Sequence, residues 1–328
     1  MRLLVVNPGF LGDTVFLGPA VRALKARWPD GQVGICVTPR GADVAGLLPG
    51  CDEVFVYDKR GADRGARGLW RAGRRLRAWA PDLALVPHPS PRSGALAWAS
   101  GARRRIGYAP LCTDRLRLNR SAPFVDQTLV LAERAGAAGD PGLALSAPPD
   151  EAAYAAEVLA GAARPVVGLV PGAEWATKRW GSERFSAVAG ALAARGASVV
   201  LLGGPGDRDR ADRIRARTGA PLRDTTGNTV AQAIAVLARC DVVIGGDTGL
   251  VHCARALGRP TLLLFGPTDP GRHRFTNRER TIAVGLGCQP CHDHGPARCP
   301  LGHHDCMRRI AVSEVAERAW ALLDGVGR

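Results

Sequence analysis

The chain has 328 residues, a formal net charge of +14 at pH 7 and a hydrophobic content of 46%. This length is typical of two domains of ordinary size, and the apolar content suffices for a core in each. No apolar run is long enough to span a bilayer, and the short apolar N-terminus lacks the features of a signal peptide. We therefore expect a cytoplasmic protein whose nine cysteines are mostly thiols.

The positive charge indicates an anionic partner, which is a nucleic acid, an anionic membrane surface or a phosphorylated substrate. The alternative is a basic surface that reflects composition, because arginine supplies nearly all of the cations. The chain keeps only three lysines, Lys25, Lys59 and Lys178. An ammonium and a guanidinium are not interchangeable, so a retained lysine points to a site that needs a compact cation. No nucleic-acid-binding motif is present, which argues against that partner.

In the first half, strands alternate with helices at the spacing of a doubly wound parallel sheet. The expected strands are 3–6, 33–37, 53–57 and 83–87, and the expected helices are about 14–28, 42–48 and 69–79. A stretch rich in Pro, Ala and Gly at 141–149 predicts a linker.

The pattern then repeats after a helix at about 151–159. The expected strands are 166–170, 199–202, 242–244 and 261–265, and the expected helices are 182–195, 209–218, 230–238, 252–257 and 313–323. We therefore predict two Rossmann-like domains, 1–148 and 149–312, followed by a C-terminal helical segment, 313–328. A ligand is expected in the cleft where the strand ends of the two domains face each other.

Asp13 follows the first strand, at the start of the first helix. It is either an N-cap or a carboxylate aimed into the cleft as a general base. The preceding loop lacks the G-x-G-x-x-G pattern, and the second strand ends in Thr38-Pro39-Arg40 instead of an acidic residue. Both features argue against a dinucleotide-dependent dehydrogenase.

Three loops of the second half have the residues of an anion site. In the segment 242–252, a strand ends in two glycines and Asp247-Thr248-Gly249 opens a helix that carries His252. Asp247 is expected to N-cap this helix, leaving backbone N–H groups for an anion, and glycines allow close approach of a ligand. The alternative is an ordinary capped turn.

The second of these loops, 171–180, combines Gly172 with two cations, Lys178 and Arg179, at a helix start, as phosphate sites do. Its alternative is a solvated loop beside a packed Trp180. The third loop, at Gly203-Gly204, is a common type of turn.

The segment 287–306 contains four cysteines and four histidines. The spacing Cys288-x2-Cys291-x7-Cys299-x6-Cys306 is suited to a structural zinc or iron–sulfur site. Free thiols, or disulfides formed on isolation, are the alternatives. The other five cysteines are expected to be small apolar fillers.

These loops, in this order and spacing, resemble glycosyltransferase family 9, the ADP-heptose:lipopolysaccharide heptosyltransferases. The loop at Gly266-Pro267-Thr268 also looks like one of the family, and the Cys-rich tail is similar to that of heptosyltransferase II-like chains. The resemblance implies an α/β GT-B fold with two facing Rossmann-like doubly wound domains. The first would bind mainly the acceptor and the second the nucleotide sugar.

By this resemblance Asp13 is the general base, Lys178 lies near the donor phosphates, and Asp247 faces the heptose hydroxyls. The residues assigned to the donor are Gly172, Lys178, Gly203, Gly204, Asn228, Asp247, Thr248, Gly249 and His252, with Asn228 at the adenine. Basic residues assigned to the anionic acceptor are Arg60, Arg64, Arg103 and Arg104. The chain departs from some members at Ala173 and Glu174, where they have two hydroxyl residues.

The implied reaction is an inverting transfer of heptose from ADP-heptose to Kdo-lipid A or the heptosylated inner core. It needs no metal or other cofactor in its chemistry. The expected location is the anionic inner face of the inner membrane, with peripheral attachment. A sugar-nucleotide epimerase or hydrolase of the same architecture is one rival, although Asp13 has no clear second acid or base. A nucleotide-binding protein without activity is another.

Overall fold

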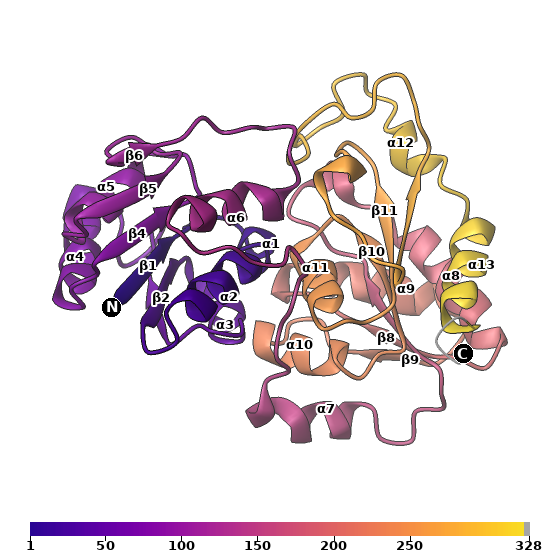
Figure 1. The fold of residues 1–328 in the computed structure, drawn as a ribbon. Helices are drawn as coiled ribbons and strands as arrows, with labels where there is room; N and C mark the ends of the chain where they lie inside the picture. The colour runs from indigo at the N-terminus through magenta and orange to yellow at the C-terminus, as the bar shows by residue number, and fades with distance from the viewer. Residues whose placement is uncertain (325–328) are drawn as a thin grey trace. The chain divides into compact units, whose positions relative to one another are not determined.

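The computed structural model describes residues 1–324, so the last four residues of the predicted segment 313–328 lie outside the described residues. The chain forms two compact units. Unit 1 comprises Met1–Ser146 and Gly271–Arg274, and unit 2 comprises Ala147–Pro270 and Phe275–Arg328. Each unit is built around one sheet with helices on its faces (Figure 1). Within residues 1–324, every helix is too short or too polar to cross a membrane.

Unit 1 contains a six-stranded sheet in the order β3-β2-β1-β4-β5-β6, in which all neighbours are parallel. The strands are β1 (Arg2–Val6), β2 (Gln32–Val37), β3 (Glu53–Val56), β4 (Leu83–Val86), β5 (Arg104–Gly107) and β6 (Asp114–Arg115). The helices are α1 (Leu11–Val15), α2 (Gly18–Arg27), α3 (Pro39–Gly46), α4 (Gly65–Ala78), α5 (Pro91–Ala99) and α6 (Phe124–Arg134). Parallel strands need crossover connections, and most of these helices provide them.

The core of unit 1 follows from the alternation of side chains along its strands. Leu4, Val6 and Val86 are buried on one face, where they pack against α4 and α5. Helix α2 packs against α6, and α1 against α3. The apolar strands are therefore covered by helices, as a parallel sheet requires.

The helix predicted at 14–28 is in fact two helices, α1 and α2, and it begins earlier, at Leu11. Pro19 is the second residue of α2. A proline lacks a backbone N–H and fits only the first turn of a helix, so the chain breaks just before it.

Unit 2 contains a second parallel six-stranded sheet, in the order β12-β11-β10-β7-β8-β9. The strands are β7 (Val166–Val170), β8 (Ser198–Leu201), β9 (Leu222–Asp224), β10 (Val242–Gly246), β11 (Thr261–Phe265) and β12 (Glu279–Ala283). The helices are α7 (Ala152–Val158), α8 (Ser182–Ala194), α9 (Arg208–Thr218), α10 (Val230–Leu237), α11 (Gly249–Ala256), α12 (Asp305–Arg308) and α13 (Val312–Asp324). Short 3-10 turns are η1 (Pro149–Glu151), η2 (Ala176–Lys178), η3 (Pro205–Asp207) and, where the chain passes between units, η4 (Pro270–Arg272).

One face of the second sheet packs against α8, α9 and α13 in a single apolar cluster. Helix α10 packs against both α7 and α11. The sheets share one topology, because counting the strands of each unit in chain order gives 3-2-1-4-5-6 in both. The doubly wound α/β class predicted from the sequence is therefore confirmed.

This strand order locates the sites. In a 3-2-1-4-5-6 sheet the order reverses between the first and fourth strands, and ligands bind beyond the carboxyl ends of the strands at that point. In unit 1 the reversal lies between β1 and β4, and in unit 2 between β7 and β10. The loops after β1, β7 and β10 carry Asp13, Lys178 and Asp247, so the residues singled out by sequence follow the strands next to the two reversals.

Candidate functional site

Asp13 lies in the first turn of α1, immediately beyond the carboxyl end of β1, and is half-buried. Its Oδ2 accepts a hydrogen bond of 2.8 Å from the backbone N–H of Phe10, which is the N-cap residue. Asp13 is therefore the third residue of α1 and not its N-cap, which was one of the two alternatives, although the carboxylate does help to cap the helix. Within residues 1–324, the hydrogen bonds of this carboxylate go to Oδ2.

Lys59 is a further candidate site residue of unit 1, and no sequence motif had marked it. Lys59, in the loop after β3, donates a 2.6 Å hydrogen bond to the carbonyl oxygen of Pro8, in the loop after β1. Burial and the charges of Arg60 and Arg92 lower the pKa of Lys59, whereas the charge of Asp13 acts in the opposite direction. Lys59 was noted only as one of three lysines, and its rarity was the signal that could have marked it.

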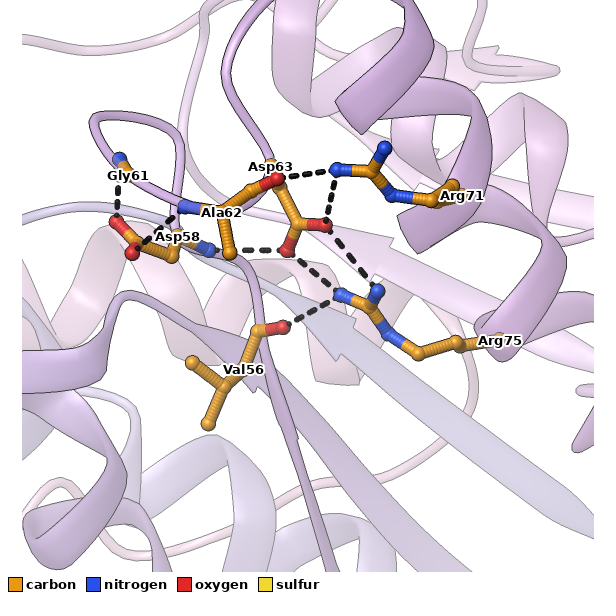
Figure 2. A network of polar contacts seen from close by, with 7 residues as sticks. All are labelled: Val56, Asp58, Gly61, Ala62, Asp63, Arg71 and Arg75. Atoms are coloured by element: carbon orange, nitrogen blue, oxygen red, sulfur yellow. Dashed lines mark hydrogen bonds and ion pairs between the residues drawn. The ribbon is translucent and has the colours of Figure 1, made fainter.

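The loop that carries Lys59 is held by a buried carboxylate, Asp63 (Figure 2). Two arginines of α4 reach it, because their spacing of four residues places both on one helix face. Arg75 Nη2 lies 2.7 Å from Asp63 Oδ2, and Arg71 Nη2 lies 4.0 Å from Oδ1. The hydrogen bonds from Arg75 hold the pKa of Asp63 below its usual range.

Asp58 shapes the other end of this loop, as Figure 2 shows. Its carboxylate accepts backbone hydrogen bonds from Gly61 at 2.9 Å and Ala62 at 3.1 Å. Its own N–H donates to Asp63 Oδ2 at 3.2 Å. The loop is thus fixed at both ends, so its exposed cations, Arg60 and Arg64, extend from an ordered backbone.

The four arginines assigned to the acceptor do not lie together. Arg60 and Arg64 follow β3 and are exposed at the carboxyl edge of the sheet, the edge of Asp13. Arg104 is the first residue of β5 and pairs in register with Leu83, the first residue of β4. Arg103 and Arg104 therefore lie at the amino edge, where Arg104 donates to the carbonyl oxygen of Arg134 at 2.8 Å. The structure does not bring these two residues to Asp13.

In unit 2, Lys178 and Asp247 form a buried ion pair across the reversal point of the sheet. Nζ of Lys178 lies 2.6 Å from Oδ2 of Asp247, and the two side chains are 13% and 8% exposed. The ammonium also donates to the backbone carbonyl of Asp247 at 3.1 Å. Lys178 ends η2, after β7, and Asp247 follows β10, so neighbouring parallel strands bring the two together.

Asp247 is not the N-cap of α11, as the sequence had suggested. The N-cap is Thr248, with extended backbone angles and no side-chain capping bond. The Asp247 carboxylate instead accepts hydrogen bonds from Thr268 Oγ1 at 2.8 Å and shares one of 2.9 Å with His252 Nε2. At least three side chains, those of Lys178, Thr268 and His252, thus converge on this carboxylate. Thr248 and Gly249 lie half-buried at the start of α11, where backbone N–H groups have no intrahelical acceptor.

Several glycines of the candidate site lie where a side chain would collide with the protein itself. A Cβ at Gly172 would lie 2.3 Å from the carboxylate of Asp207, and one at Gly203 would lie 2.9 Å from Cβ of Asp207. A Cβ at Gly246 would lie 2.7 Å from the carbonyl oxygen of Lys178. Gly204, by contrast, has open space around its Cβ position. At Gly172, Gly203 and Gly246 the absence of a Cβ is therefore required by contacts within the protein.

Asn228, assigned to the adenine pocket, hydrogen-bonds through Nδ2 to the hydroxyl of Tyr154 on α7. Burial raises the pKa of Tyr154. Tyr154 was not selected from the sequence, because a lone tyrosine on a short helix carries no distinguishing pattern. Trp180 is 2% exposed and packs edge-on against Phe185, so for this residue the packed alternative is confirmed.

The Cys-rich segment lies directly against the lysine loop. Oγ1 of Thr177 donates to the carbonyl oxygen of Pro296, and Nε2 of His304 lies 2.7 Å from the carbonyl oxygen of Thr177. A Cβ added at Gly295 would lie 3.1 Å from Cγ and Cε of Lys178. The shape of this segment therefore bears on the position of the Lys178 side chain.

The four cysteines of this segment are electrostatic neighbours. Burial and the charges of the other three raise the pKa of Cys306 to about 11. Backbone N–H groups of residues 301–304 act on Cys299 in the opposite direction and lower its pKa, that of His304 most strongly. All nine cysteines are free in the structure. Three of the other five, Cys36, Cys240 and Cys253, are buried, as expected of apolar fillers.

The chain was compared with known proteins. The family model "Glycosyltransferase family 9 (heptosyltransferase)" matches residues 69–299. Lipopolysaccharide heptosyltransferase 2 of Salmonella typhimurium is 27% identical over 364 aligned positions that cover 100% of both chains. This relative extends the similarity to the N-terminal segment that carries Asp13.

Solved structures show the same fold. The glycosyl transferase family 9 protein of Veillonella parvula superposes with a TM-score of 0.88 at 23% identity, covering 98% of this chain and 97% of its own. The E. coli ADP-heptose lipopolysaccharide heptosyltransferase II superposes with a TM-score of 0.79 at 24% identity, covering 100% of both chains. The GT-B fold implied by the sequence resemblance is thereby confirmed. The chain belongs to glycosyltransferase family 9 and is a glycosyl-transferring enzyme.

Proposed function

We propose that the chain transfers heptose from ADP-heptose to the lipopolysaccharide inner core, with inversion at the anomeric carbon. The observation that carries this proposal is the buried Lys178–Asp247 pair at the reversal point of the second sheet, beside the start of α11. A diphosphate placed there would meet an ammonium and the N–H groups of a helix start. The names of the matched relatives supply the donor and acceptor classes.

In this proposal Asp13 supplies the base, and Lys178 and the start of α11 hold the donor. An acceptor hydroxyl attacks the anomeric carbon of the heptose, Oδ1 of Asp13 accepts its proton, and ADP departs from the opposite face. One base suffices for such a displacement. Negative charge grows on the leaving diphosphate, where Lys178 and the N–H groups near Thr248 and Gly249 stabilise it. No step of this scheme requires a metal ion.

Asp247 has a different role here from the one first inferred. Three side chains already occupy its carboxylate, so we assign it to holding Lys178 in place. Asn228 and Tyr154, which are hydrogen-bonded to each other, remain our candidates for the adenine. Gly204, open at its Cβ position, is a glycine of the donor set that leaves space for a ligand.

We assign acceptor binding to the carboxyl edge of the first sheet. Lys59, Arg60 and Arg64 supply three cations on the ordered loop after β3, suited to the phosphates and carboxylates of Kdo-lipid A or of the heptosylated inner core. The net charge of +14 suits a lipid acceptor at an anionic surface, and we propose peripheral attachment at the inner face of the inner membrane.

The test of the function is an acceptor comparison. The purified protein is incubated with ADP-heptose and either Kdo-lipid A or heptosyl-Kdo-lipid A, and products are identified by mass spectrometry. We expect one heptose to be added to one of the two acceptors, together with release of ADP. Release of ADP that is independent of acceptor, or conversion to an isomeric nucleotide sugar, would instead identify a hydrolase or an epimerase.

We also propose that Cys288, Cys291, Cys299 and Cys306 hold a structural zinc ion or iron–sulfur cluster. The support is chemical fit. The four thiols influence one another's ionisation, and that of Cys299 is stabilised as a thiolate by backbone N–H groups. A thiolate is the form that binds metal. The metal would brace the segment that packs on Thr177 and Lys178.

Elemental analysis of protein purified without a histidine tag tests this site. We expect about one zinc ion, or one cluster, per chain, as in four-cysteine sites, and its loss in Cys299→Ser. Cys112→Ser is the matched control, because Cys112 lies in unit 1 and outside the segment. Metal-free protein with full activity, or disulfides among these cysteines in protein isolated under reducing conditions, would refute the site.

A further inference from the structure

A row of buried polar groups continues from the Lys178–Asp247 pair through unit 2. His252 Nε2 lies 2.9 Å from Asp247 Oδ1, and Arg255 Nη1 lies 3.3 Å from His252 Nδ1. Nε of Arg255 then donates to Oε1 of Glu279 at 2.9 Å. The side chains of His252, Arg255 and Glu279 are 4%, 1% and 5% exposed. Apart from the imidazole, positive and negative side chains alternate along the row, so each buried charge lies next to a partner that offsets its desolvation cost.

The arginine decides how the imidazole is protonated. A guanidinium only donates hydrogen bonds, so Nδ1 of His252 must be the acceptor at this contact. The proton of a neutral imidazole then resides on Nε2, which donates to Asp247 Oδ1. Arg255 is itself fixed by Glu279 on one side and by the ring of Phe275, 4.8 Å from its guanidinium carbon, on the other.

The two oxygens of Asp247 therefore have separate tasks. Oδ1 is occupied by His252, and Oδ2 faces Lys178 and Thr268. Because one oxygen is tied to the helix interior, the carboxylate cannot rotate without losing that bond. This orientation keeps the ammonium of Lys178 beside the start of α11.

We propose that His252, Arg255 and Glu279 are positioning residues for the nucleotide-sugar site, and that they act on the donor diphosphate through Asp247 and Lys178. This inference rests on the proposed function, which places the diphosphate at Lys178. It assigns to His252 an indirect role in donor binding in place of a direct contact. It also assigns roles to Arg255 and Glu279, which no sequence motif had marked.

The main test compares His252→Leu with His252→Gln. Leucine removes the hydrogen bonds to Asp247 and Arg255, whereas a glutamine amide can donate to Asp247 and accept from Arg255. Calorimetry with ADP should show about a tenfold weaker affinity for His252→Leu, the equivalent of one hydrogen bond to a charged group. His252→Gln should restore most of the affinity. The KM for the acceptor should be unchanged in both variants.

A double-mutant cycle tests the relay, which is the action of His252, Arg255 and Glu279 on the donor through Asp247 and Lys178, separately from the proposed donor site. If His252 acts through Lys178, the loss caused by His252→Leu should disappear in a Lys178→Ala background. Lys178→Ala alone must weaken ADP binding, and unchanged affinity would overturn the proposed donor site. If Lys178→Ala weakens binding and His252→Leu adds its full effect to it, the donor site stands and the relay is refuted.

Nitrogen-15 NMR of the wild-type protein reports the tautomer of His252 directly, and the His252→Gln variant serves only to assign its signal. The signal lost in His252→Gln should be that of a neutral imidazole protonated on Nε2. An imidazole protonated on Nδ1, or a charged imidazolium at neutral pH, would refute the relay. If His252 served only fold stability, His252→Leu would have a lower melting temperature and a smaller active fraction, but its folded protein would bind ADP as the wild type does. That result would also refute the relay.

Discussion

Replacement of Asp63 by asparagine tests how the loop after β3 is held. The change keeps the size of the side chain but removes its charge and one of its two acceptor oxygens. Asp63 is 4% exposed and accepts hydrogen bonds from Arg75 at 2.7 and 3.2 Å. It also accepts one from the backbone of Asp58 at 3.2 Å. Asparagine therefore places an N–H₂ group where a guanidinium or a backbone N–H points.

The expected cost follows from the burial of each partner. Breaking a fully buried ion pair costs about 3–5 kcal/mol, and a hydrogen bond to a charged group contributes about 1.5–3 kcal/mol. The side chain of Arg75 is 47% exposed, so water can solvate it after the change. We therefore expect Asp63→Asn to lower the free energy of unfolding by about 2 kcal/mol. For a unit of this size that corresponds to a melting temperature about 4–8 °C lower.

The pH dependence has a definite sign. Arg75 lowers the pKa of Asp63 in the folded state, so the stabilisation is complete above the pKa of an unfolded aspartate, about 3.9. It is lost as the pH falls through the lowered folded value. The difference between wild type and Asp63→Asn should therefore be constant at neutral pH and should shrink in acid.

Calorimetry and urea unfolding measure the effect, with Asp212→Asn as the control. Asp212 also pairs with an arginine, Arg215, but the side chains are 70% and 53% exposed, so we expect a change within about 0.5 kcal/mol. Equal stabilities for the two variants, or a wild-type advantage over Asp63→Asn that grows in acid, would refute this account of the loop.

Three further predictions concern other parts of the molecule. Gly68→Ala should destabilise unit 1 by about 1–3 kcal/mol in urea unfolding, because the new Cβ would lie 2.1 Å from a backbone carbon of the preceding loop. Gly206→Ala is the control and should leave the stability unchanged, because the space around its Cβ position is open. Equal stabilities of the two variants would contradict this prediction. In metal-free protein, iodoacetamide at pH 7.5 should label Cys299 well before Cys253. The pKa of Cys299 is lowered, whereas Cys253 is buried and its pKa is raised to about 12. The reverse order of labelling in peptide mass spectra would contradict this difference in thiol reactivity. Lys59→Met should raise the KM for the acceptor and leave ADP affinity unchanged by calorimetry, and the opposite pattern would remove Lys59 from the acceptor site.

Most of the fold could be predicted from the sequence, because its strands are continuous apolar runs. The strands predicted at 166–170 and 261–265 match β7 and β11 to the residue. The strands that were not predicted lack such a run. β5 begins with two arginines, β9 has three residues, and β12 contains Glu279 and Arg280. These strands are held by pairing with neighbours, which a local pattern does not reveal.

Two of the helices that were not predicted, α5 and α6, have a similar explanation. Helix α5 has only a weakly amphipathic pattern. It begins at Pro91, a residue that is tolerated at the first position of a helix, and Ser90 before it is the N-cap. Helix α6 begins at Phe124, directly after a proline. Local propensity does not decide whether these two segments are helical, and packing against other helices stabilises both of them.

The loops of the candidate site could be found from sequence, but the partners within them could not. Lys178 and Asp247 lie 69 positions apart, and only the adjacency of β7 and β10 brings them together. The reason for glycine at 172 and 203 is likewise absent from the local sequence. Their space is filled by Asp207, a contact between loops that no local motif encodes.

The central claim is that Asp13 is the general base of a heptose transfer whose donor is held elsewhere in the chain. The most direct test compares wild type with Asp13→Asn in two measurements, ADP-heptose affinity by calorimetry and heptose transfer under saturating substrates. The account predicts an affinity within about twofold of wild type, since Asp13 is not among the residues assigned to the donor, and a turnover reduced by roughly 100-fold or more. A turnover close to that of wild type would contradict it.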